Sequence, residues 1–107
     1  ASFIQNIHNQ LNLKEHELGP IGCVIGATNK NCSNWREKLP NSLFLMPGIG
    51  AQGGDWETVR LCLNNDGTGV WVPISRGITF IKSHIEDRSQ YLENVKHNLD
   101  AAIQQAT

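Results

Sequence analysis

The sequence predicts an α/β fold in which three parallel strands alternate with helices. Three short apolar segments, at 21–26, 43–46 and 69–74, are typical of buried strands. Helical signals precede, separate and follow these segments, as in the repeating units of a parallel sheet. The chain has 107 residues, of which 39% are hydrophobic, which is enough for one small domain.

The first half of the chain supplies a helix, a strand and a second helix. Apolar residues at helical spacing predict an amphipathic helix over 2–13. The apolar run at 21–26 is rich in β-branched residues, which favours a strand over a helix. A short helix is expected at 33–38, where Ser33 would be the N-cap and Pro40 would end it.

The second half of the chain supplies two longer helices around the last strand. One helix is expected at 55–65, with Asp55 as its N-cap and Gly67 at its end. Pro73 cannot donate to a sheet ladder, but it is tolerated where the backbone leaves the last strand. The final helix is expected at about 84–105. The positions expected to face inward are Trp56, Val59, Cys62 and Leu63 in the first helix and Ile85, Leu92, Val95, Leu99 and Ile103 in the second.

Charge and composition argue against several classes of function. Nine Lys and Arg against ten Asp and Glu give a net charge of −1, and without a basic block nucleic-acid binding is not expected. No apolar run approaches the ~20 residues that a membrane helix needs. The three cysteines include no Cys-x-x-Cys pair, which favours a reduced, cytoplasmic setting with Cys23 and Cys62 as small buried residues. The four histidines lack metal-ligand spacing, so no metal is expected.

The glycine-rich segment 46–54, Met-Pro-Gly-Ile-Gly-Ala-Gln-Gly-Gly, lies between a predicted strand and a predicted helix. Glycine allows positive φ and a close approach to a ligand, and the start of a helix favours an anion. This segment therefore predicts a site for a phosphorylated small molecule. Its Gly48-x-Gly50-x-x-Gly53 spacing also matches the dinucleotide fingerprint. However, no acidic residue stands at 73–75, the end of the next strand, to bind a ribose hydroxyl.

Two further side chains fit a phosphate site. Arg76, between Ser75 and Gly77, could bind a phosphate through paired hydrogen bonds, helped by the backbone N–H groups of Arg76 and Gly77. Gln52 could bridge two parts of one ligand, because an amide both donates and accepts. Taken singly, Arg76 could instead pair with a local carboxylate and Gln52 could brace its loop. Together, the two strand-end loops match the phosphate site common after the last two strands of (β/α)8 barrels.

Three motifs make the sequence resemble a known family. They are Gly-Cys-Val-Ile-Gly-Ala-Thr at 22–28, Phe-Leu-Met-Pro-Gly-Ile-Gly-Ala-Gln-Gly-Gly at 44–54, and Ser-Arg-Gly-Ile at 75–78. In this order and spacing they resemble orotidine 5′-phosphate decarboxylase over about residues 15–80, especially the bacterial branch with longer chains. The resemblance implies a (β/α)8 TIM barrel, of which these are the last three strands. It also implies decarboxylation of orotidine 5′-phosphate to UMP in pyrimidine synthesis, without metal or organic cofactor, by a cytoplasmic homodimer.

The resemblance assigns roles to particular residues. Gln52 would contact both the phosphate and the pyrimidine carbonyl, and Pro47 would lie along the pyrimidine. Arg76 would bind the phosphate dianion, helped by backbone N–H groups around Ser75 and Arg76. Gly50 and Gly77 would complete the phosphate site. This sequence departs from the expected pattern at Pro73, and at Asn29-Lys30, which replaces a proline-containing turn.

The residues that perform the family's chemistry are absent from this chain. The resemblance implies an Asp-x-Lys-x-x-Asp motif on an earlier strand, and none of Asp55, Asp66, Asp87 and Asp100 has lysine two residues later. The expectation is that 1–107 forms a single segment, the carboxyl-terminal part of a decarboxylase. Alone it would be inactive, and would oligomerise or be marginally stable because its sheet edges are open. Two alternatives stay open: another phosphate-binding barrel enzyme (a sugar-phosphate decarboxylase or isomerase), or a non-catalytic nucleotide-binding module.

Overall fold

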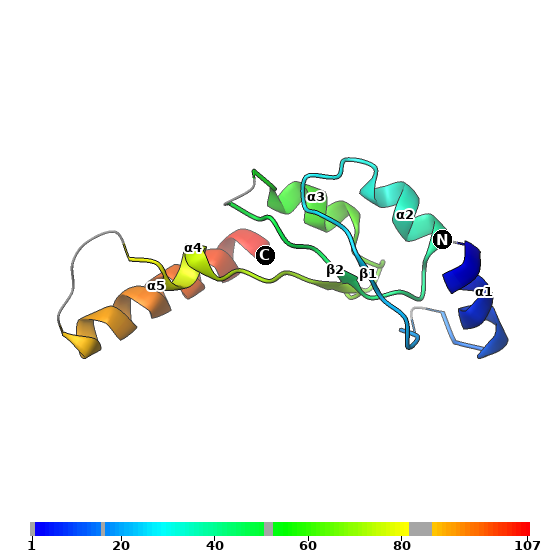
Figure 1. The fold of residues 1–107 in the computed structure, drawn as a ribbon, viewed down its shortest axis with the longest axis horizontal. Helices are drawn as coiled ribbons and strands as arrows, with labels where there is room; N and C mark the ends of the chain where they lie inside the picture. Colours follow the sequence, from blue (N-terminus) through cyan, green and yellow to red (C-terminus); the bar gives the residue numbers. More distant parts are fainter. Residues whose placement is uncertain (1, 16, 51–52, 82–86) are drawn as a thin grey trace. The chain divides into compact units, whose positions relative to one another are not determined.

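The structure is a computed structural model that describes residues 2–15, 17–50, 53–81 and 87–107 (Figure 1). The chain divides into two compact units, Ala1–Pro73 and Ile74–Thr107, and each is described by itself. In chain order, the elements are α1 (Ser2–Gln10), β1 (Cys23–Val24), α2 (Cys32–Lys38), β2 (Phe44–Leu45), α3 (Trp56–Leu61), β3 (Val70–Trp71), α4 (Arg76–Thr79) and α5 (Arg88–Ala106).

The first unit contains a three-stranded parallel sheet in the order β1-β2-β3. Cys23 pairs with Phe44, and Phe44 pairs with Val70. The ladder continues beyond the short strands, since the amide of Ile25 donates to the carbonyl of Leu45 at 2.9 Å. The predicted α/β class with three parallel strands is confirmed, although each regular strand is shorter than the apolar segment around it.

The two faces of the sheet have different surroundings. One face packs against α2 and α3, which contact each other (Figure 1). The core on this face consists of Ile25, Ala27, Cys32, Leu39, Phe44, Met46, Val59 and Cys62. The opposite face carries Val24, Leu45 and Trp71, which are cross-strand neighbours and are 70%, 37% and 66% exposed. The sheet thus has one covered face and one exposed apolar face.

The helix boundaries follow local hydrogen bonding rather than hydrophobic pattern alone. The prediction of Ser33 as the N-cap of α2 is wrong: the N-cap is Asn31, and its side chain makes no capping bond. The N-cap prediction for α3 is confirmed, because the Asp55 side chain accepts from the Thr58 amide. The α3 helix ends at Leu61, earlier than the predicted range of 55–65 with Gly67 as its terminator.

A tight turn explains the early end of α3. The amide of Asn64 donates to the carbonyl of Thr68 at 2.8 Å, which turns the chain back toward β3. Gly67 lies inside this turn with a φ of +80°, a conformation that glycine adopts without strain. Gly67 therefore belongs to this turn and does not end the helix.

Arg36 of α2 is almost fully buried and is bonded entirely to backbone carbonyls. Its Nε donates to Cys62 at 2.8 Å, and its Nη2 donates to Gly69 at 2.8 Å. Its Nη1 donates to Leu39 at 3.1 Å and to Ser42 at 2.8 Å. The guanidinium therefore links α2, the end of α3 and the start of β3.

The cysteines differ from the sequence expectation of unpaired thiols. The structure places Cys32 and Cys62 as a disulfide, with Cα atoms 5.4 Å apart and 30 residues between them in sequence. Both are fully buried, where the start of α2 meets the end of α3, and their Cα spacing suits a disulfide. Cys23 is a free thiol and is partly buried.

The second unit contains α4 and the long α5, which pack together. The Tyr91 hydroxyl donates to the Thr79 carbonyl at 2.9 Å, and the Asn98 amide donates to the Ile78 carbonyl at 3.1 Å. The short α4 was not predicted. The predicted last helix begins later than expected, at Arg88, and part of its predicted start lies outside the described residues.

The prediction that α5 buries an apolar face is wrong for this unit. Leu92, Leu99 and Ile103 are 53%, 42% and 54% exposed, and α5 has no buried residue. Ile85 lies outside the described residues. Among the described residues of this unit (74–81 and 87–107), the one helix that packs on the 19-residue α5 is the four-residue α4, so most of the apolar side of α5 is uncovered there.

Candidate phosphate site

The glycine loop, residues 47–54, follows β2 at the carboxyl edge of the parallel sheet. Ligands of parallel α/β sheets bind beyond this edge. Three described glycines of the loop have positive φ: +103° at Gly48, +76° at Gly50 and +80° at Gly53. These values are rarely adopted by other residues, so the glycine-rich sequence is needed for the path of this backbone.

Backbone hydrogen bonds close the loop on itself. The amide of Gly54 donates to the carbonyl of Gly48 at 2.9 Å, and the amide of Gly53 donates to Gly50 at 3.2 Å. A Cβ placed on Gly54 would lie 2.7 Å from the Gly48 carbonyl oxygen, so this position has no room for a side chain. By contrast, a Cβ on Gly50 or Gly53 would meet nothing within 4 Å. The outer side of the loop is therefore open to a ligand, while its base is closed.

The loop residues that were predicted to contact the ligand differ in their exposure to solvent. Pro47 is half-buried at the start of the loop, and its carbonyl accepts from the Ala27 amide at 2.9 Å. Gly50 is exposed at the open side. Gln52, the predicted contact to both phosphate and pyrimidine, lies outside the described residues. The structure thus brings Pro47 and Gly50 into one loop and leaves the prediction for Gln52 untested.

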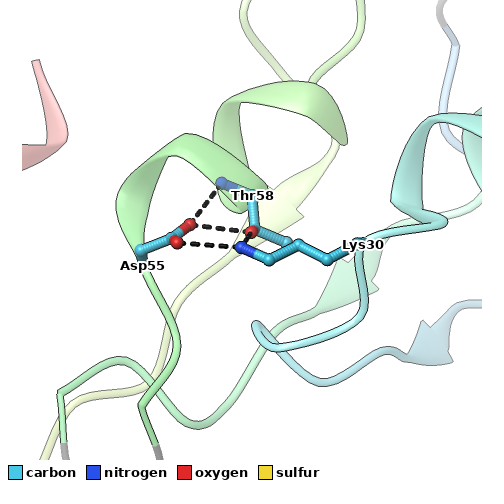
Figure 2. Close-up of polar contacts among 3 residues, drawn as sticks. All are labelled: Lys30, Asp55 and Thr58. Atoms are coloured by element: carbon cyan, nitrogen blue, oxygen red, sulfur yellow. Dashed lines mark hydrogen bonds and ion pairs between the residues drawn. The ribbon is translucent and has the colours of Figure 1, made fainter.

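A polar cluster stands directly after the loop and was not predicted as part of the site (Figure 2). Lys30 Nζ donates to Asp55 Oδ2 at 2.9 Å and to Thr58 Oγ1 at 3.0 Å. Asp55 Oδ1 accepts from the Thr58 amide at 2.8 Å and from its hydroxyl at 2.7 Å. The hydrogen bonds from Lys30 and then from Thr58 hold the pKa of Asp55 well below its usual range. The sequence signal for Lys30 was its departure from the expected proline-containing turn.

The cluster also limits what the start of α3 can offer to an anion. The helix has only six residues, and the Thr58 amide is already bonded to Asp55. A contribution from the first turn of this helix was part of the sequence argument for phosphate binding. In the structure, the candidate anion-binding feature is instead the backbone of the glycine loop, which is open at Gly50 and Gly53.

The other predicted phosphate ligands lie in the second unit. Ser75 precedes α4, and its carbonyl accepts from the Thr79 hydroxyl at 2.8 Å. Arg76 is the first residue of α4 and is exposed, and its guanidinium bonds to none of the described residues. A Cβ on Gly77 would lie 3.2 Å from Ile74 Cγ2, which leaves little room for a side chain. Ser75, Arg76 and Gly77 are thus adjacent at one helix start.

The described residues contain neither a cluster of metal-ligating side chains nor a helix that could cross a membrane. Among residues 2–15, 17–50, 53–81 and 87–107, no group of three or more His, Cys, Asp or Glu could hold a metal ion. None of the helices in this described part is long and apolar enough to cross a membrane. A three-stranded parallel sheet whose strands alternate with helices, with a glycine loop at its carboxyl edge, defines the fold class: part of an α/β barrel.

Comparisons with curated proteins identify one family, although no family model matches the chain. The chain is 39% identical to the orotidine 5′-phosphate decarboxylase of Caldicellulosiruptor bescii over 90 residues, which are 78% of this chain and 30% of that protein. It is 35% identical to the corresponding protein of Dehalococcoides mccartyi over 101 residues, 92% of this chain and 37% of that protein. The chain thus spans about a third of the length of these relatives.

Solved structures give the same result. A Plasmodium yoelii structure, assigned as an orotidine-monophosphate decarboxylase, matches 94% of this chain and 29% of its own with a TM-score of 0.59 and 26% identity. A Toxoplasma gondii structure of the same assignment matches 78% of this chain and 30% of its own, with a TM-score of 0.53 and 32% identity. The chain therefore belongs to the orotidine 5′-phosphate decarboxylase family, as a partial-length member with part of the barrel fold.

Proposed function

We propose that this chain is the carboxyl-terminal part of an orotidine 5′-phosphate decarboxylase and binds the phosphate of its substrate. The whole enzyme would convert orotidine 5′-phosphate to UMP and CO₂ in pyrimidine synthesis. The observation that carries the proposal is the glycine loop, whose backbone is open at Gly50 and Gly53 at the carboxyl edge of a parallel sheet. Relatives named for this activity are 39% and 40% identical to this chain over 90 and 73 residues.

In this proposal the chain supplies binding groups and not the reacting groups. Arg76 binds the phosphate dianion with the backbone around Ser75 and Gly77, and Gln52 reaches from the phosphate to the pyrimidine. Pro47 lies along the pyrimidine, and Gly50 lets the loop approach the phosphate. The Lys and Asp residues that act on the carboxylate would come from the rest of the protein, because no Asp-x-Lys-x-x-Asp stands in this chain.

A phosphate site remote from the reacting carbon still contributes to catalysis. Binding energy from a non-reacting group can stabilise the transition state if the protein uses it to fix the substrate in a reactive position. Charge-assisted hydrogen bonds contribute roughly 1.5–3 kcal/mol each. The proposal therefore assigns to Arg76 and the glycine loop an effect on kcat/KM, even though neither touches the departing CO₂.

The remaining parts of the proposal concern the assembly and its setting. The complete enzyme is a cytoplasmic homodimer that uses no metal or organic cofactor and binds no nucleic acid. Residues 1–107 form one segment of its barrel domain. Two open edges of the three-stranded sheet, at β1 and β3, leave the isolated chain marginally stable or self-associating.

Ligand preference distinguishes this function from its rivals. In calorimetry with the full-length protein that contains this chain, UMP should bind at least about tenfold more tightly than ribose 5-phosphate. Equal affinity for the two would favour a sugar-phosphate enzyme of the same fold class. UMP binding without any decarboxylation by the full-length protein would favour a non-catalytic nucleotide-binding module. The isolated chain should show no decarboxylation, and measurable activity from it would contradict the assignment of the reacting groups to other residues.

A further inference from the structure

Lys30 connects two segments that are distant in sequence and adjacent at the carboxyl edge of the sheet (Figure 2). It lies between β1 and α2, and its ammonium group contacts Asp55, 25 residues further on, at the start of α3. Two oxygen acceptors engage the ammonium group, Asp55 Oδ2 at 2.9 Å and Thr58 Oγ1 at 3.0 Å. Asp55 directly follows Gly54, the last residue of the glycine loop.

The segment that carries Lys30 also contacts both ends of the glycine loop. The amide of Ala27 donates to the carbonyl of Pro47, the first loop residue, at 2.9 Å. A Cβ on Gly54 would lie 2.6 Å from the Cβ of Ala27, so the backbone of Gly54 packs directly on this buried methyl group. Segment 27–30 therefore supports the base of the loop, and the Lys30–Asp55 pair fixes the residue at which the loop joins α3.

We propose that Lys30 is a positioning residue for phosphate binding: it fixes the end of the glycine loop through Asp55 without touching the ligand. The inference rests on the proposed function, since it names a residue that supports the same site. Glycine loses more conformational freedom than any other residue when it is ordered. The loop has glycines at 48, 50, 53 and 54. If a neighbouring segment already holds the ends of such a loop, its backbone loses less conformational freedom when phosphate binds, and the affinity for phosphate is higher.

The expected effect is modest because the pair is accessible to water. The side chains of Lys30 and Asp55 are 70% and 50% exposed. Exposed ion pairs contribute little, and the corresponding change in affinity is about two- to fivefold. The Ala27 contacts remain when Lys30 is changed, so the loop would loosen at one end and keep its support at the base.

The test is a double-mutant cycle on UMP affinity, measured by calorimetry in the full-length protein that contains this chain. Lys30→Met removes the cation. Asp55→Asn removes the charge but keeps an oxygen that can accept from the Thr58 amide, so the helix keeps its N-cap. Each single substitution should weaken UMP binding about two- to fivefold. The double substitution should be no worse than the weaker-binding single variant, because both remove the same interaction.

Matched controls separate positioning from general effects of charge and stability. Lys14→Met removes an exposed lysine elsewhere in the same unit and should leave UMP affinity unchanged. Lys30→Arg, which can still bond both oxygens, should restore most of the affinity. Amide hydrogen exchange gives an independent readout: the Gly54 amide, bonded to Gly48, should exchange faster in Lys30→Met than in the wild type.

The outcomes are distinguishable from failure of the proposed function. If wild-type protein does not bind UMP, the proposed function is contradicted. If the wild type binds UMP and Lys30→Met binds it equally well, the positioning role is overturned and the function stands. Additive losses in the cycle, or an equal loss in Lys14→Met, would likewise overturn it. Lys30→Gln repeats the test with a polar side chain if the Met variant proves insoluble.

Discussion

Replacing Arg36 tests whether the hydrogen bonds from its buried guanidinium stabilise the first unit. Arg36→Met keeps an unbranched apolar stem but removes every donor. The carbonyls of Cys62, Leu39, Ser42 and Gly69 would each lose a hydrogen bond of 2.8–3.1 Å in a buried setting. Methionine cannot replace these bonds, because its thioether has no hydrogen to donate to a carbonyl.

The magnitude follows from two opposing terms. Four hydrogen bonds to a charged donor, at roughly 1.5–3 kcal/mol each, would give an upper bound of about 6–12 kcal/mol. Burial lowers the pKa of Arg36 from its ordinary value, which indicates that the charged form is poorly solvated. Removing a buried charge recovers that desolvation penalty, several kcal/mol per ion. The net loss in the free energy of unfolding should therefore be about 2–4 kcal/mol.

The assay is equilibrium urea unfolding followed by tryptophan fluorescence, on the full-length protein that contains this chain. The control is Arg88→Met, which removes an exposed arginine of α5 and should change the free energy of unfolding by less than about 0.5 kcal/mol. Arg36→Lys should fall between the two, because three donors on one nitrogen cannot reach four carbonyls. A loss below about 0.5 kcal/mol for Arg36→Met would refute the reasoning.

Three further predictions concern the site. Arg76→Ala in the complete enzyme should lower kcat/KM by about two orders of magnitude, and a loss under about threefold would remove Arg76 from the phosphate site. Gly54→Ala should weaken UMP binding about tenfold or more in calorimetry, because its Cβ would lie 2.7 Å from the Gly48 carbonyl oxygen. The control is Gly67→Ala, whose Cβ would meet nothing within 4 Å. It should lower stability, because the φ of +80° at this position disfavours alanine, and should leave the UMP affinity unchanged. Asp55 has a depressed pKa in the folded state, so its contribution to stability is complete above its unfolded pKa of about 3.9 and is lost as pH falls through the folded value. A carboxyl carbon NMR titration should find this folded pKa raised in Lys30→Met, and an unchanged value would contradict the assigned cause.

The strand segments and the glycine loop could be predicted because the apolar runs and the glycine spacing that indicate them are local in sequence. Apolar runs at 21–26 and 43–46 enclose the observed β1 and β2, and the glycines at 48, 50 and 53 do adopt positive φ. The resemblance of the motifs to one family was confirmed by the comparisons. These features need only the neighbouring residues, or a stretch of matching sequence, to be recognised.

The features that could not be predicted depend on contacts between distant residues. Cys32 and Cys62 are separated by 30 positions, and only the packing of α2 against α3 brings them together. The four acceptors of Arg36 come from turns whose carbonyl directions no sequence pattern reveals. The apolar pattern of α5 predicted a buried face, but burial also needs a partner surface, and α4 is the one helix that the described part of its unit packs against it. The predictions for Gln52 and Arg76 as ligands of phosphate stay predictions.

The exposed row formed by Val24, Leu45 and Trp71 has a practical consequence for protein engineering. The row crosses all three strands on the face opposite the core, while the covered face already has its own packed interior. Under the proposed function, a segment built in this way would suit a split-protein reporter, in which two separately expressed pieces regain activity only when they are brought together. Polar substitutions at Val24 or Trp71 would tune how strongly the pieces reassociate, and would leave the interior of the segment unchanged.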